Sequence, residues 1–127
     1  MNKDLEKKLI EEFPTFFKNI YGHPSKTCMA FGLDCGEGWY DLIYETCKKI
    51  KELDRDNTFV FLQIKEKFGG LRLYCSGGNK EIGVIISKAE DESYKICEYC
   101  GTKENITTEG RWILTLCKDC RNKRDSE

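Results

Sequence analysis

Four cysteines near the C-terminal end follow the pattern C-x2-C-x16-C-x2-C. Each C-x2-C pair forms a tight knuckle that places two sulfurs within reach of one ion, and the 16 intervening residues suit a hairpin that brings the knuckles together. Four thiolates then complete a tetrahedral zinc shell and leave no position for water. The sequence therefore predicts one structural zinc ion in a small ribbon, with the ligands Cys97, Cys100, Cys117 and Cys120.

The same pattern leaves other interpretations open. The cysteines could be reduced and unliganded or could form a redox pair, and iron is the main competitor of zinc for four thiolates. Two C-x2-C pairs at zinc-finger separation favour the metal. Because a ribbon of about 25 residues cannot bury a core of its own, the metal would also hold it folded.

The rest of the chain reads as one α+β domain. Apolar periodicity predicts helices at 2–13, 37–53 and 80–95, and strands at 58–66 and 71–76 joined by a turn at Gly69–Gly70. On the first strand, Val60, Leu62 and Ile64 are expected to share one face. We therefore expect helices packed on a β-hairpin or small antiparallel sheet, followed by the four-cysteine zinc ribbon. The predicted core residues are Trp39, Phe59, Phe61 and Leu73.

The domain organisation expected from this pattern is a core at 1–95, a zinc ribbon at 96–122 that packs on it, and a tail at 123–127. The formal net charge of the 127 residues is only −1, so no global field draws the chain onto DNA or an anionic membrane. An export signal or membrane span is not visible, which predicts a cytoplasmic protein.

The hairpin turn carries the residues that we expect to bind a ligand. Cations flank the two glycines, and a tyrosine lies near them. Glycine lets a ligand approach the backbone, and the cations could hold phosphate or carboxylate. An ordinary polar hairpin tip is the alternative interpretation. The candidate ligand-binding residues are Lys65, Lys67, Gly69, Gly70, Arg72 and Tyr74.

Nucleic-acid binding through the ribbon is a second hypothesis. A basic end follows the last knuckle, formed by Lys118, Arg121, Lys123 and Arg124, and Trp112 could stack on a base. Against this, residues 96–127 carry six Lys/Arg and six Asp/Glu, and zinc with four thiolates adds a formal charge of −2. A solvated tail is the simpler interpretation.

Catalysis is a third hypothesis. Asp34, Glu37 and Asp41 form an acidic cluster that could perform acid–base chemistry, although helix starts collect acidic residues anyway. The sequence supplies no motif with a nucleophile or base. A second metal site on Cys28, Cys35 and His23 is a further alternative.

Three segments, LDCGEGWYDLI (33–43), QIKEKFGGLRLY (63–74) and CEYCG…GRWILTLCKDC (97–120), together carry a family resemblance. The chain resembles a group of small, mostly uncharacterised proteins from phages, prophages and bacteria. Their pattern runs ECGDGWFDLI, then KEKFGGLRFY, then CxxCG…GWxxTLCxxC, and this chain departs from it at Asp34, Glu37 and Arg111.

The resemblance suggests a phage-related biological context and implies no biochemical mechanism. By association it suggests host takeover or counter-defence, in the host cytoplasm if the protein is phage-encoded. The sequence as a whole favours a non-enzymatic zinc-containing protein that binds a host protein or a small anionic, nucleotide-like ligand.

Overall fold

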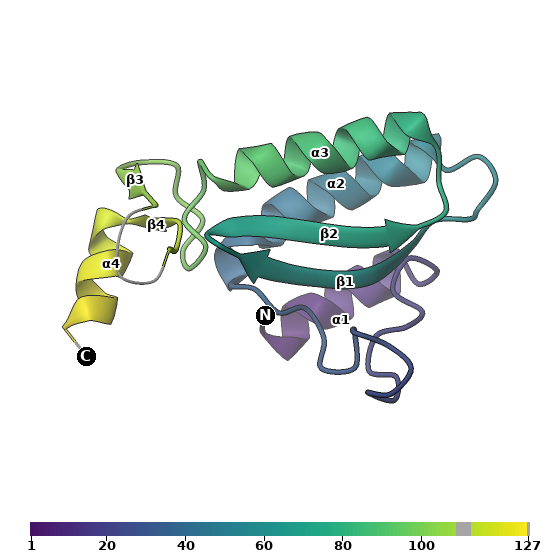
Figure 1. The fold of residues 1–127 in the computed structure, drawn as a ribbon, viewed down its shortest axis with the longest axis horizontal. Helices are drawn as coiled ribbons and strands as arrows, with labels where there is room; N and C mark the ends of the chain where they lie inside the picture. The colour runs from purple at the N-terminus through teal and green to yellow at the C-terminus, as the bar shows by residue number, and fades with distance from the viewer. Residues whose placement is uncertain (109–112, 127) are drawn as a thin grey trace.

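The chain folds into a two-stranded hairpin covered by helices, with a small ribbon beyond the hairpin turn (Figure 1). The structure is a computed structural model and describes residues 1–108 and 113–126. Its elements are α1 (Lys3–Glu12), the 3₁₀ turn η1 (Glu37–Trp39), α2 (Tyr40–Leu53), β1 (Val60–Lys67), β2 (Gly70–Ser76), α3 (Lys80–Ser93), β3 (Ile106–Thr107), β4 (Leu116–Cys117) and α4 (Lys118–Asp125). The predicted α+β fold is confirmed.

Asparagine side chains cap the N-termini of two helices. Asn2 accepts a hydrogen bond from the backbone of Leu5 at the start of α1, and Asn79 accepts one from Ile82 at the start of α3. Asn79 also donates to the carbonyl of Leu53, which ties the start of α3 to the end of α2. None of the described helices is long and apolar enough to cross a membrane.

The hairpin turn is formed by Phe68 and Gly69, whose φ angles are 52° and 84°. Two positive φ angles are typical of the tight turns that match the twist of a hairpin. Gly70, predicted as part of the turn, is instead the first residue of β2 and lies opposite Lys67. The prediction of a hairpin is correct, and its turn lies one residue earlier than expected.

A β-bulge shifts the register of β1 between Phe61 and Gln63. Phe61 and Ile64 are buried, whereas Leu62 is 42% exposed. The prediction that Val60, Leu62 and Ile64 share one face is therefore wrong, because one extra residue moves every following side chain to the other face.

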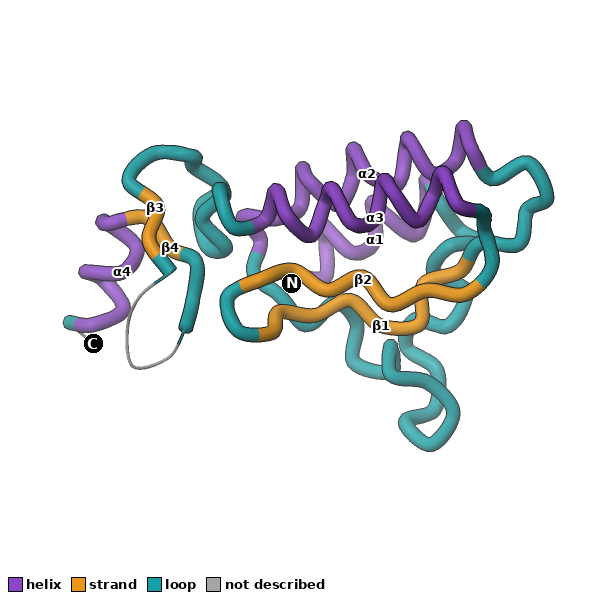
Figure 2. Tube along the Cα trace, turned by 45° about the horizontal axis from the view of Figure 1, so that its top comes forward, coloured by secondary structure: helices purple, strands orange, loops and turns teal. Residues whose placement is uncertain are grey.

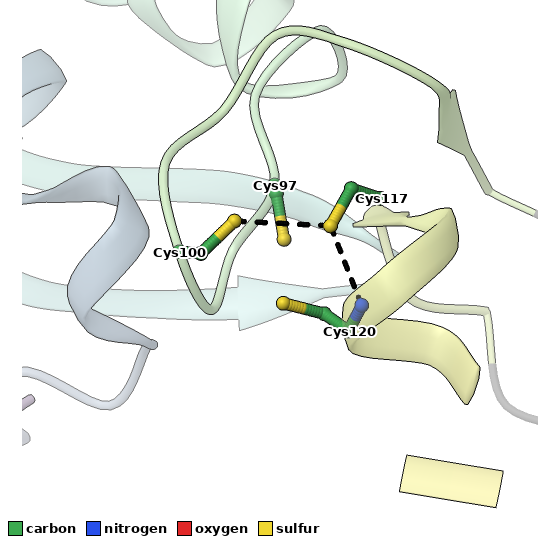
Figure 3. Close-up of side chains that lie close together, drawn as sticks. All are labelled: Cys97, Cys100, Cys117 and Cys120. Carbon is green, nitrogen blue, oxygen red and sulfur yellow. Dashed lines mark hydrogen bonds between the residues drawn. The ribbon is translucent and has the colours of Figure 1, made fainter. Parts of the chain in front are cut away.

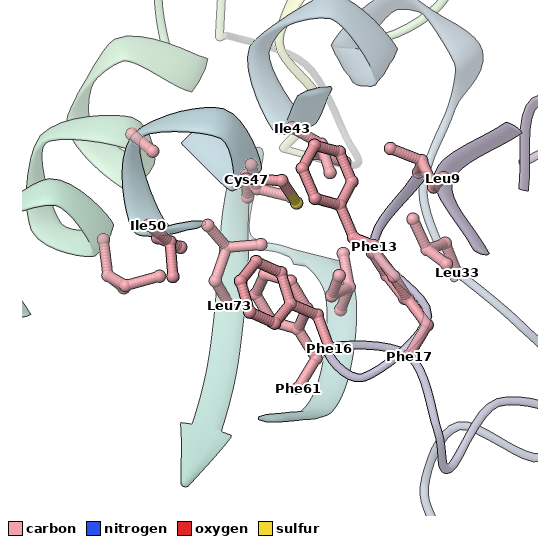
Figure 4. Packing of buried hydrophobic residues seen from close by; sticks show 14 of the residues in the cluster. Leu9, Phe13, Phe16, Phe17, Leu33, Ile43, Cys47, Ile50, Phe61 and Leu73 are labelled. Atoms are coloured by element: carbon pink, nitrogen blue, oxygen red, sulfur yellow. The ribbon is translucent and has the colours of Figure 1, made fainter. Parts of the chain in front are cut away.

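One face of the hairpin packs on α1, α2 and α3, which lie on the same side of it (Figure 2). Trp39, Phe59, Phe61 and Leu73 are buried, as predicted. Figure 4 shows how the aromatic rings after α1 meet the hairpin and α2 in this core. Phe16, for example, contacts Phe59 and Phe61 in edge-to-face geometry.

Both edges of the hairpin are hydrogen-bonded to neighbouring segments. Along β2, the N–H of Leu71 donates to the Ser93 hydroxyl (2.9 Å) and the N–H of Leu73 donates to the Glu90 carboxylate (2.9 Å), so α3 covers this edge with side chains. Along β1, Phe61 donates to the carbonyl of Phe16. Asp34 forms a parallel bridge with Lys65 on the same edge.

The buried carboxylate of Glu6 organises the long connection between α1 and α2. It accepts hydrogen bonds from the Leu33 backbone (2.7 Å) and from the Tyr21 hydroxyl. Gly32, with φ +87°, passes so close that an added Cβ would meet this carboxylate. Burial of the phenol and its hydrogen bond to Glu6 raise the pKa of Tyr21 to about 12.

Candidate metal centre

The four predicted sulfurs converge at one place. All lie within 4.8 Å of one another, and the Sγ atoms of Cys100 and Cys117 are 3.7 Å apart (Figure 3). Among the residues that the structure describes, these four cysteines form the one cluster of ligating side chains able to hold a metal ion. The donor set consists of sulfur alone, which suits a closed tetrahedral site and leaves no position for a substrate.

Each knuckle is built by local backbone geometry. In the first, Gly101 donates to the carbonyl of Cys97 (2.9 Å) and has φ +83°, as expected for a residue closing such a turn. The second knuckle begins in β4 and ends in the first turn of α4, where the Cys117 sulfur accepts from the N–H of Cys120 (3.4 Å). The pairing of Ile106 with Cys117 joins β3 to β4 between the knuckles.

The electrostatics of the cluster favour a negative charge on one sulfur. Burial opposes ionisation of Cys97, but N–H groups of Cys117, Cys100 and Tyr99 outweigh it and lower the pKa of this thiol to about 7. Burial and the neighbouring sulfurs raise the pKa of Cys120. A divalent cation would remove this competition by stabilising all four thiolates together.

The first knuckle packs against η1, the turn that leads into α2. Gly38 donates to the carbonyl of Glu98 (2.8 Å), and Gly36 donates to the Glu98 carboxylate (2.9 Å). An added Cβ on Gly38 would meet the carbonyl of Cys97 and lie 2.6 Å from the nitrogen of Gly101. Glycine is required here because the two backbones touch.

The hairpin turn also contacts the ribbon, at a different point from η1. The Thr115 hydroxyl donates to the carbonyl of Gly69 (2.6 Å), and the Glu98 N–H donates to the carbonyl of Thr115 (2.9 Å). Trp39 Nε1 donates to the carbonyl of Ile96 (2.9 Å) just before the first knuckle. The three sequence segments that carry the resemblance therefore meet where the ribbon joins the core.

Sequence reasoning missed Glu98 and Thr115 as the side chains that hold this junction. Glu98 is buried, one carboxylate oxygen has no hydrogen-bond partner among the described residues, and burial raises the pKa of this group. Its partner Gly36 lies 62 positions away in sequence. The two glycines that flank Glu37 gave no usable signal, because glycine is also favoured at a helix N-cap, the position of Gly36.

The structure divides the six candidate ligand residues into two groups. Gly69 and Gly70 are buried, Gly69 beneath Ile113 and Thr115 and Gly70 beneath Tyr94, so the glycines serve close packing. The side chains of the other candidates lie on the outer face of the hairpin, where the cross-strand pairs are Lys65 with Arg72, Lys67 with Gly70, and Gln63 with Tyr74. Arg72 donates to the Tyr94 hydroxyl (3.0 Å).

The three acidic candidates lie on different elements. Asp34 is beside β1, Glu37 is in η1 and Asp41 is in the first turn of α2. They are not part of the ligating cluster formed by the described residues. Their positions are those of a bridge residue and of acidic residues at a helix start, where the helix dipole favours them.

The second metal site is not formed by the described residues. Cys35 is buried, Cys28 is exposed, and His23 contacts the Ser25 hydroxyl. None of the three belongs to the described ligating cluster. Burial raises the pKa of Cys35 to about 12, so this thiol stays neutral at physiological pH.

The basic end folds as α4, which crosses the boundary expected at residue 122. The Arg121 guanidinium is hydrogen-bonded within the ribbon, because it donates to Thr107 and to the carbonyl of Leu114 (2.8 Å). Arg124 lies 3.6 Å from Asp125, whereas Lys118 and Lys123 are exposed. Trp112, predicted to stack on a base, lies outside the described residues.

No protein-family model, curated protein or solved structure matches this chain. The resemblance to phage and bacterial proteins therefore stays a prediction.

Proposed function

We propose that this chain is a non-enzymatic binding protein that is held together by a structural zinc ion and takes an anionic partner on the outer face of its hairpin. The observation that carries the proposal is the cross-strand pair of Lys65 and Arg72 on that face. We call the side chains of Gln63, Lys65, Lys67, Arg72 and Tyr74 the hairpin face.

Zinc is supported by the chemistry of the ligand set. Four sulfurs in two knuckles, with two of them buried, match the closed sites in which zinc has a structural role. The ion would fix the first knuckle, which contacts both the start of α2 and, through Thr115, the hairpin turn. Metal bound at this position would stabilise the end of the hairpin as well as the ribbon.

Charge on the hairpin face supports an anionic partner. Like charges placed directly opposite each other destabilise a sheet, and a bound anion relieves that repulsion. Among the described residues, neither Lys65 nor Lys67 is in an ion pair. Asp34 bridges to Lys65 through the backbone without forming one.

The resemblance suggests what the partner could be in a cell. For a phage or prophage protein, a nucleotide-like molecule or an acidic surface of a host protein would suit this face, and counter-defence would be the role. Nucleic-acid binding through the ribbon has less support, because Arg121 is bound within the ribbon. Catalysis by Asp34, Glu37 and Asp41 has no clustered site to support it.

Two measurements test the proposal. Elemental analysis of the purified protein should find about one zinc ion per chain. Isothermal titration at low salt with inorganic triphosphate should give heat, and the double variant Lys65→Ala, Arg72→Gln should bind at least about tenfold more weakly. The matched control removes two exposed lysines of the helices, Lys49→Ala and Lys88→Ala. Absence of heat, or equal loss in the control, would refute the anion site.

A further inference from the structure

We infer that the anionic partner is a single strand of nucleic acid, laid along the hairpin face with its bases against exposed aromatic rings. This inference rests on the proposed function and specifies its ligand. It is carried by the arrangement of aromatic and basic side chains on an open two-stranded surface.

The first observation is that exposed aromatic rings lie beside cations, one on the hairpin face and one in the turn at its end. Tyr74 is 41% exposed and lies on the strand next to Lys65 and Lys67. Phe68, in the turn, is 68% exposed, and Lys67 Nζ lies 5.8 Å from the centre of its ring. Both rings are exposed enough for a base to stack on them.

The second observation is that one cation is held in place before a ligand arrives. Arg72 donates to the Tyr94 hydroxyl and to the carbonyl of Leu71 (3.0 Å each). Its guanidinium carries further N–H donors that a phosphate can accept from. Lys65 stands opposite it on β1, so a phosphate between the two strands would meet a cation from each.

The third observation is the shape of this surface. In Figure 1 no described helix or strand crosses in front of the hairpin, and the cavities found between α1, α2 and α3 have other linings. A mononucleotide on an open face buries less of its surface than it would in a concave site. An extended strand adds several weak contacts along its length, through its phosphates and its bases. An acidic peptide would use the cations and leave the aromatic rings without a partner.

The test uses metal-loaded, full-length protein and fluorescence anisotropy with a labelled 12-nucleotide oligothymidine. We expect binding that weakens steeply with salt. Tyr74→Ala should reduce affinity about 5- to 100-fold through lost stacking, and Lys65→Ala should lower the salt slope by about one. The control Lys49→Ala should leave both unchanged. The Tyr74→Ala protein is compared with wild type by circular dichroism to show that it is folded.

The competitors separate this inference from the proposed function. Unlabelled ATP, a 12-base-pair duplex and an oligoglutamate peptide are compared with the single strand. If ATP, duplex or peptide binds as tightly as the single strand, the single-strand inference is wrong and the anion site stands. If the single strand binds but Tyr74→Ala changes nothing, the stacking arrangement is wrong. If none of the four binds, both proposals fail.

Discussion

Replacing Gly38 with alanine tests how tightly the ribbon is fitted to the core. The new Cβ would meet the carbonyl of Cys97 and come within 2.7 Å of the carbonyl carbon of Glu98. These are backbone atoms of a metal knuckle and cannot swing aside as a side chain would. The knuckle must move away from α2, which puts the hydrogen bond from Gly38 to Glu98 at risk.

The expected cost follows from these two effects. Overpacking of this kind costs about 1–3 kcal/mol, and losing one hydrogen bond adds about 1 kcal/mol. We therefore expect Gly38→Ala to lower the free energy of unfolding by about 2–4 kcal/mol. With a urea dependence of about 2 kcal/mol per molar, the midpoint should fall by about 1–2 M.

The chain supplies its own control at Gly83, one turn after the start of α3. Apart from its chain neighbours and the backbone of its own helix, no atom of the described residues lies within 4 Å of the Cβ that alanine would add there. Gly83→Ala should raise stability by about 0.5–1 kcal/mol, because alanine favours the helix. Both variants are unfolded in urea at the same free zinc concentration, since bound metal contributes to stability. A Gly38→Ala protein as stable as wild type would refute the tight fit between knuckle and helix.

Three further predictions concern the metal, the sheet edge and the hydroxyl of Tyr21. Chelation should unfold the ribbon while the separate apolar core persists. Limited proteolysis should therefore cut after residue 95 before it cuts α1, α2 and α3, and simultaneous cutting throughout would contradict this. Ser93→Ala leaves the Leu71 N–H without its acceptor and should lower the free energy of unfolding, measured in urea, by about 1–3 kcal/mol. An unchanged urea midpoint would show that water replaces the Ser93 hydroxyl as the acceptor. The pKa of Tyr21 is raised to about 12 in the folded state, so the folded protein holds this proton at pH values where the unfolded chain has released it. The contribution of the Tyr21 hydroxyl to stability is therefore complete below pH 10 and is lost as the pH rises toward 12. The pKa values of Tyr40 and Tyr44 are raised as well, so ultraviolet titration should show fewer tyrosines ionising near pH 10 in wild type than in the unfolded chain, and Tyr21→Phe should reduce that difference without removing it.

Much of the fold could be predicted because its signals are local. The knuckle spacing alone places sulfurs in pairs, and the apolar periodicity locates the helices and the hairpin to within a few residues. Large aromatic residues such as Trp39 and Phe61 are buried because removing their apolar surface from water stabilises the fold.

Other features depend on contacts that no local pattern encodes. The bulge at Leu62 breaks the alternation on which the strand prediction relied. Helix α4 has no apolar stripe, and its start depends on Cys117 acting as the cap. The packing role of Gly38 appears only once Glu98, far away in sequence, is brought against it. Glycine in a helix start and glycine in a contact look identical in one sequence.

The covered edges of the hairpin have a consequence for how copies of this chain behave together. A sheet of two strands ordinarily offers two borders on which a strand from another molecule can grow. Here Ser93 and Glu90 bind two N–H groups on one border, those of Leu71 and Leu73, and Phe16 and Asp34 bind backbone groups on the other. A strand from a second copy would have to displace these bonds before it could pair with the hairpin, so we expect the protein to resist association through its sheet edges at high concentration.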